Sequence, residues 1–316
     1  MPITFENGQP IHQSIVLQSS EGGMVSGVIS DANSGKPLNG AKVELLLNEE
    51  NVAETFVEAN GRFEFENVSE GNYLLKVEAE GYLKVEQEVK FRGEPLTINL
   101  AMNPIQRVAV LYDHYSYNGS FASLLEERGI PVTPLTVSNI VDRISEFDVV
   151  FVNQMSTTTV KKDHFEAMME AADAAETSVI FGDSYYTDSP ISRLKEFRGD
   201  PEIRGNAYLA NTPAGYVVDA EHPIFGEAKI GDYIEVLNPS KSYLGYFDDY
   251  SGYELASIKH EDRNSYGLGI AYKPRTANSV ELLMSGHSFS LAHNASQYTP
   301  EGKDMLIRAI VVRQIL

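Results

Sequence analysis

The strongest constraint on the fold is a change of sequence pattern near Pro104. Before it, residues 23–102 form short runs in which apolar and polar side chains alternate, separated by turn residues. This pattern is typical of strands with one buried face. After it, short apolar runs alternate with segments of helical periodicity, as in parallel sheets whose two faces are covered by helices. The sequence therefore predicts two domains of different class within its 316 residues.

The first predicted domain, residues 23–103, is all-β. Seven strands are expected, at residues 24–29, 41–47, 54–57, 62–65, 71–79, 85–89 and 96–100. The Asn60-Gly61 pair favours a tight turn, because both residues tolerate positive φ. This number of strands is typical of a β-sandwich. Residues 1–22 alternate only weakly and are predicted to form a leading strand and a linker.

The second predicted domain, residues 104–316, is α/β. Strands are expected at residues 108–112, 132–135, 149–152, 178–182 and 280–284, and helices around 121–125, 160–172 and from Pro300 onward. Apolar runs alternating with helices predict a doubly wound, flavodoxin-like parallel sheet. Residues 200–275 are less regular and rich in tyrosine and glycine, with strand-like runs at residues 233–237 and 269–272.

Charge and composition exclude several classes of function. The formal net charge is −20, which disfavours binding to nucleic acid or to anionic membranes. The chain contains no cysteine, so disulfides and thiolate catalysis are excluded. No apolar run is long enough to span a membrane. Residues 1–25 lack the features of a signal peptide. The protein is then either cytosolic or a piece of a longer exported chain, and we expect the second.

Short motifs along the first domain follow one order and spacing. They are Gly27-Val28-Ile29, Gly35-Lys36-Pro37-Leu38, Gly40-Ala41-Lys42-Val43, Asn60-Gly61-Arg62-Phe63, Gly71-Asn72-Tyr73 and Gly81-Tyr82. With these motifs the domain resembles the carboxypeptidase regulatory-like, transthyretin-type (prealbumin-like) β-sandwich. The resemblance implies a spacer, a folding aid or a weak binding module, since a fold alone does not define a function.

Scattered segments of the second domain carry another resemblance. They are residues 108–111 with Asp113, residues 149–152, Gly182-Asp183-Ser184-Tyr185, Glu221-His222-Pro223-Ile224-Phe225, Gly269-Ile270-Ala271-Tyr272 and Ser285-Gly286-His287. The domain resembles the class I glutamine amidotransferase-like fold. The order of the two domains is similar to that in accessory regions of secreted subtilisin-like serine proteases of Gram-positive bacteria.

The amidotransferase resemblance implies a cysteine nucleophile, which this chain lacks. At the corresponding turn Ser184 is the alternative nucleophile, with His287 as base and Asp183 or Asp113 as the orienting acid. The turn does not match the G-x-S-x-G elbow, because a tyrosine replaces the second glycine. The competing interpretation is that Ser184 caps a helix and that His287 is a structural histidine.

Several residues are candidates for ligand binding without catalysis. Asp113 and Tyr185 follow predicted strands, where doubly wound sheets bind ligands. Tyr246 and Tyr250 belong to a tyrosine cluster that also contains Tyr243 and Tyr253, and it predicts either a sugar- or peptide-binding face or core packing.

Two further motifs contain residue types that can bind a metal ion. Asp248, Asp249 and Glu254 suggest calcium, with a solvated acidic loop as the alternative. The His222-Pro223 segment lacks the neighbouring ligands that a metal needs, and its Ile224 and Phe225 are predicted to anchor a loop in the core. No cofactor is expected otherwise.

The function that these observations favour is a non-catalytic accessory or binding module of an exported or cell-surface bacterial protein. Its expected partners are neighbouring domains of a longer chain, and cell-wall polysaccharide or a protein substrate. Two alternatives remain open, namely a serine hydrolase using Ser184 and His287, and a self-assembling surface-layer-type protein.

Overall fold

The structure is a computed structural model. It describes residues 22–111, 120–152, 161–182, 194, 197, 205–206, 214–237, 246–247, 250–260, 263–284 and 298–311. The chain divides into two compact units, residues 1–80 with 84–102, and residues 81–83 with 103–316. Each unit has its own core. None of the described helices is both long and apolar enough to cross a lipid bilayer.

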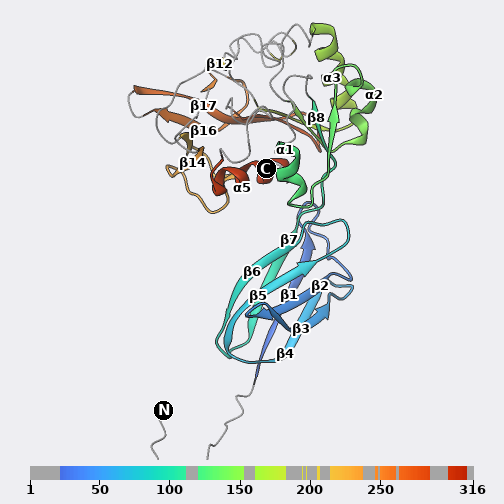
Figure 1. Ribbon diagram of the computed structural model, residues 1–316, viewed down its shortest axis with the longest axis vertical. Helices are drawn as coiled ribbons and strands as arrows, with labels where there is room; N and C mark the ends of the chain where they lie inside the picture. The colour runs from blue at the N-terminus through green and yellow to red at the C-terminus, as the bar shows by residue number, and fades with distance from the viewer. Residues whose placement is uncertain are drawn as a thin grey trace, which may run out of the picture. The chain divides into compact units, whose positions relative to one another are not determined.

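The first unit is a β-sandwich (Figure 1). Its strands are β1 (Gly23–Asp31), β2 (Lys42–Leu47), β3 (Glu50–Phe56), β4 (Arg62–Val68), β5 (Gly71–Glu78), β6 (Val85–Phe91) and β7 (Leu96–Met102). They form one sheet of order β4-β1-β7 and a second of order β3-β2-β5-β6. All seven strands expected from the alternating pattern are present, and the prediction of a β-sandwich is confirmed.

Side chains of the sandwich alternate between its core and its outer faces, as the period of two requires. Val43, Leu45, Leu75 and Val77 of the second sheet are fully buried. Burying each such side chain stabilises the fold by about 1.5–3 kcal/mol. Their neighbours along β2 and β5 point to the outer face of the sheet.

Gly27 in β1 is required by close packing between strands. β1 pairs in parallel with β7, where Gly27 lies opposite Ile98. A Cβ atom added to Gly27 would lie 1.6 Å from the carbonyl oxygen of Ile98. Because backbone cannot move away as a flexible side chain can, only glycine fits at this position.

The second unit combines parallel and antiparallel strands with helices. Its strands are β8 (Val108–Leu111), β9 (Val132–Leu135), β10 (Val149–Val152), β11 (Ser178–Phe181), β12 (Gly205–Asn206), β13 (Ala214–Val218), β14 (Tyr233–Leu237), β15 (Tyr246–Phe247), β16 (Tyr253–His260), β17 (Arg263–Pro274) and β18 (Val280–Met284). The helices are α1 (Ser120–Glu126), α2 (Ile140–Arg143), η1 (Ile144–Glu146), α3 (Lys162–Ala174), η2 (Pro223–Phe225) and α5 (Pro300–Val311).

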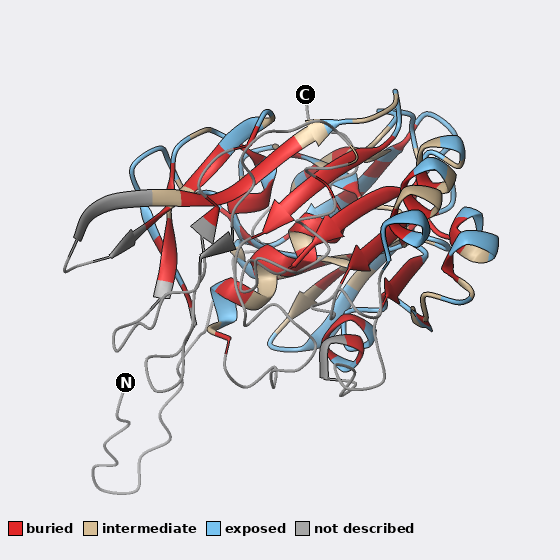
Figure 2. Ribbon diagram, turned by 90° about the horizontal axis from the view of Figure 1, so that it is seen from above, coloured by how far each residue is buried: buried red, intermediate tan, exposed pale blue. Residues whose placement is uncertain are grey.

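Five of these strands pair in parallel, in the order β9-β8-β10-β11-β18. Helices α1 and α5 pack on one face of the sheet and α2 and α3 on the other (Figure 1). All residues of β8, β10, β11 and β18 are buried, and Figure 2 shows the buried residues in red along the strands of the sheet. Each apolar run that predicted a buried strand is therefore a strand covered on both faces.

Beyond β18 the sheet continues with antiparallel strands, in the order β18-β17-β16-β13-β14. The sequence pattern indicated only parts of this region, at residues 233–237 and 269–272. The long β16–β17 hairpin and β13 were not predicted. Glycines such as Gly215 and Gly269 interrupt the alternation, because they are needed where another residue packs against the strand. A Cβ atom on Gly269 would lie 2.7 Å from the ring of Tyr216.

Candidate functional site

The predicted catalytic residues, together with Asp113 and Tyr185, come in sequence after the carboxyl ends of parallel strands. The ends of β8, β10 and β11 are level with one another, with Leu111 opposite Val152 and Val152 opposite Phe181. Gly182 follows β11 directly, and a Cβ atom there would lie 2.2 Å from the ring of Phe151. Asp113, Asp183, Ser184, Tyr185 and His287 lie outside the described residues. Their proposed roles therefore stay predictions.

The tyrosine cluster is described only in part. Tyr250 is buried, and its hydroxyl donates a hydrogen bond of 2.6 Å to Glu281 Oε1. Tyr253 is 61% exposed and stacks on Tyr272, with ring centroids 5.1 Å apart. Tyr246 pairs through its backbone with Asn206. For Tyr250 the environment is that of core packing, one of the two interpretations that the sequence left open.

Tyr250 belongs to a buried charged network that sequence reasoning missed. Glu281 is fully buried in β18, with Nη1 of Arg275 3.6 Å from its Oε2. Arg275 also donates to Asp173 Oδ1 (2.6 Å) and to the carbonyl oxygen of Met169 (2.8 Å). The network ties α3 to β18 at the amino ends of the parallel strands, opposite the edge where such sheets bind ligands. We interpret it as a structural clamp.

His222 has a structural role of a different kind. Its Nδ1 accepts a hydrogen bond of 3.2 Å from the backbone N–H of Ile224, and so caps η2. Ile224 and Phe225 are buried, which confirms that they anchor this loop in the core. Burial lowers the pKa of His222 from 6.5 to about 4. Within the described part of the chain, no group of three or more histidine or acidic residues is arranged to hold a metal ion.

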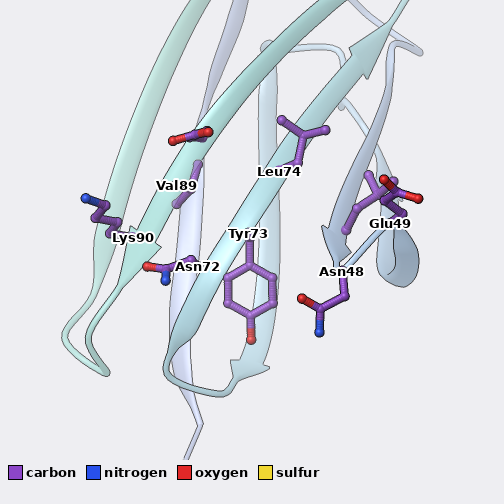
Figure 3. Close-up of a pocket in the computed structure, with 9 residues that line it drawn as sticks. Asn48, Glu49, Asn72, Tyr73, Leu74, Val89 and Lys90 are labelled. Atoms are coloured by element: carbon purple, nitrogen blue, oxygen red, sulfur yellow. The ribbon is translucent and has the colours of Figure 1, made fainter.

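Among the described residues, one cavity with room for a ligand lies on the sandwich. It is a groove of about 500 Å³ lined by Leu46, Asn48, Glu49, Asn72, Tyr73, Leu74, Glu88, Val89 and Lys90. Figure 3 shows the β2–β3 turn on one side of it and β5 and β6 on the other. Leu46 pairs with Leu74 across β2 and β5, and Leu74 pairs with Glu88 across β5 and β6. These three outward-facing residues therefore form one row across the sheet.

The rim of this groove is polar and unpaired. Among the described residues, none gives a hydrogen bond or an ion pair to the side chains of Asn48, Glu49, Asn72, Glu88 or Lys90. A polar rim whose hydrogen-bonding groups are all available, around a half-buried apolar floor, is the general form of a ligand site.

The other half of the same sheet face is organised differently. There, Lys42 pairs with Glu44 and Glu54, with N–O distances of 2.6 and 3.1 Å. Lys76 pairs with Glu44 and Glu78, at 3.4 and 2.7 Å. Hydrogen bonds from the two lysines lower the pKa of Glu44. The charged side chains on this half pair with one another, whereas those of the groove have no partner among the described residues.

The turn beside the groove holds two residues in an unfavourable conformation. Asn48 and Glu49 have φ angles of 52° and 67°, which a two-residue hairpin of type I′ requires. Asparagine tolerates this conformation, but a glutamate there costs about 1–2 kcal/mol relative to glycine. Glu49 therefore lies at the edge of the groove at a cost in stability.

Comparisons with known proteins bear on the first unit. Residues 24–103, less than half of the chain, match the model of the carboxypeptidase regulatory-like domain. The resemblance predicted for this domain is thereby confirmed. No curated protein matches the sequence.

Several solved structures resemble part of the chain, at low sequence identity and with low TM-scores. The major pilin subunit BcpA of Bacillus cereus is 15% identical over 26% of this chain and 30% of its own, with a TM-score of 0.20. The pilus 2b backbone protein of group B streptococcus is 17% identical over 26% and 41%, with a TM-score of 0.24. The 5-hydroxyisourate hydrolase of Klebsiella pneumoniae is 22% identical over 24% and 89%, with a TM-score of 0.21. The chain thus spans less than half of either pilus protein.

Proposed function

We propose that this chain is a non-catalytic binding module of an exported bacterial protein, in which the carboxypeptidase regulatory-like sandwich contacts the ligand. The observation that carries the proposal is the groove over Leu46 and Leu74 with its unpaired polar rim. A sandwich that acted only as a spacer would have no need of such a hollow on its solvent face. Cell-wall polysaccharide, a protein substrate and neighbouring domains are the partners that suit this role.

We further propose that the second unit is an amidotransferase-like domain without amidotransferase chemistry. Its parallel strands follow the order second, first, third, fourth and last in the chain, the flavodoxin-like order. Because the chain has no cysteine, no thiolate is available to attack an amide. A parent protein of the subtilisin-like protease type, located outside the cell or on its surface, fits the domain order.

Two measurements on the full chain test this function. In the first, the chain is incubated with purified Gram-positive cell walls and sedimented, and we expect it to sediment with them. In the second, it is treated with a fluorophosphonate probe, and we expect no labelling. Labelling that is lost in Ser184→Ala would favour the serine-hydrolase alternative instead. Light scattering addresses the remaining alternative, since a surface-layer-type protein would assemble as its concentration rises, whereas a binding module would not.

A further inference from the structure

We propose that the groove on the sandwich is a binding site for a neutral sugar chain, with Leu46 and Leu74 as its floor and Asn72 and Glu88 as its main polar contacts. The proposal rests on the proposed function, because it names the ligand class of that same site. It is carried by the shape of the groove, the chemistry of its rim and the pairing of the strands beneath it.

The shape and the floor suit a sugar ring. A volume of about 500 Å³ lies in the range of sites that enclose small ligands. Leu46 and Leu74 are partly buried and lie side by side in adjacent strands. A pyranose ring presents an apolar face of C–H groups, which can cover these two side chains and remove them from water.

The rim suits hydroxyl groups, which both donate and accept hydrogen bonds. Glu49 and Glu88 accept from hydroxyls, Lys90 donates to them, and the amides of Asn48 and Asn72 do both. Hydrogen bonds from a hydroxyl to a carboxylate are charge-assisted and therefore strong. An anionic ligand is disfavoured, because two of the three charged groups on the rim are negative.

A peptide suits the groove less well than a sugar. Peptides usually bind to sheets by adding a strand at an exposed edge. The groove lies over β2, β5 and β6, and its floor residues Leu46 and Leu74 belong to β2 and β5, each of which is already paired on both sides. Of these three strands only β6 is an edge strand, so a peptide lying across the floor would find no free backbone groups there and would depend on side-chain contacts. A basic peptide is therefore the alternative that the experiment must separate.

The experiment is calorimetric titration of the full chain with the soluble hexasaccharides of glucose, mannose and N-acetylglucosamine. We expect at least one of them to bind. Asn72→Ala and Glu88→Gln should each weaken binding about tenfold, which corresponds to about 1.4 kcal/mol. The matched control is Glu86→Gln, on the same face of β6 but outside the groove, where Glu86 pairs with Lys84. The control should bind as the unchanged chain does.

The salt dependence of the affinity distinguishes a neutral sugar from a basic peptide as the ligand. Binding of a neutral sugar should not change with ionic strength, whereas binding of a basic peptide weakens as salt screens its charges. The proposal is overturned if none of the three sugars binds, or if a lysine pentapeptide binds in the groove with strong salt dependence instead.

The inference and the proposed function can fail separately. If a sugar binds equally well to the unchanged chain, to Asn72→Ala and to Glu88→Gln, the groove is not its site. The chain would nonetheless remain a binding module. Fluorophosphonate labelling abolished by Ser184→Ala would overturn the non-catalytic function, without affecting what the titrations say of the groove.

Discussion

Replacing Arg275 by methionine tests whether the buried network holds the second unit together. Both Arg275 and Glu281 are almost completely inaccessible, with side-chain exposures of 1% and 0%. The substitution preserves much of the side-chain volume and removes the positive charge 3.6 Å from Glu281. It also removes the hydrogen bonds to Asp173 and to the carbonyl oxygen of Met169. The buried carboxylate of Glu281 thereby loses this cation.

The expected cost follows from that burial. Breaking a buried pair by removing one partner destabilises a protein by about 3–5 kcal/mol. For a unit of this size each kcal/mol lowers the melting temperature by about 2–4 °C, so a decrease of about 6–20 °C is expected. Differential scanning calorimetry measures it, and the sandwich should melt as it does in the unchanged chain. In the double variant Arg275→Met with Glu281→Gln, part of the loss should be recovered, because glutamine carries no charge.

The matched control is Arg143→Met in the same unit. The guanidinium of Arg143 is exposed and pairs with Glu146 at the surface, with an N–O distance of 2.7 Å. Exposed pairs contribute little to stability because water and salt screen them. The control should therefore not change the melting temperature. If Arg275→Met shifts melting no more than Arg143→Met does, the network is not a clamp.

Three other predictions concern separate parts of the structure. In His222→Asn the capping acceptor is kept but the titration is lost. As the pH falls from about 6.5 to about 4, only the unfolded state of the unchanged chain gains a proton at His222. The free energy of unfolding of the unchanged chain should therefore fall by about 1–3 kcal/mol relative to the variant. An equal pH dependence of the two proteins in urea unfolding would contradict this. Gly27→Ala should destabilise the sandwich by about 3 kcal/mol through its clash with Ile98, and Gly35→Ala by only about 1–2 kcal/mol from its φ of 67°; calorimetry should rank them in that order. Glu49→Gly relieves about 1–2 kcal/mol at the positive φ, but glycine also gives the unfolded chain more conformational freedom, so the stability of the sandwich should rise by only about 0.5–1 kcal/mol. The same variant should weaken sugar binding, and a loss of stability in urea unfolding would argue against strain at this turn.

The sequence predicts the elements of this chain well where each follows one simple period. The alternation in residues 41–47 and 71–79 indicates β2 and β5, and the apolar run at 149–152 indicates β10, because the burial of each depends on local pattern alone. The β16–β17 hairpin is missed because glycines and tyrosines obscure its alternation. Tertiary packing, not local propensity, determines that strand pair.

The candidate sites are less predictable, because they depend on register and on distant contacts. The groove exists only because Leu46, Leu74 and Glu88 fall in one row of three strands, and no single strand reveals that row. Likewise Asp173 and Arg275 are about a hundred positions apart in sequence, and Glu281 has the appearance of an ordinary solvent-facing strand residue. The roles of Ser184 and His287 remain predictions from sequence.

The outer face of the β3-β2-β5-β6 sheet carries the argument for function. An antiparallel sheet with one solvated face should carry polar residues there, and Lys42, Glu44 and Lys76 follow that rule in paired charges. Leu46 and Leu74 break it at two adjacent positions, beside polar groups that have no partner in the described part of the chain. Charged residues at these two positions would make this face of the sheet more soluble. Local departures of this kind are expected at functional sites. The sugar titrations test whether the departure at Leu46 and Leu74 is one.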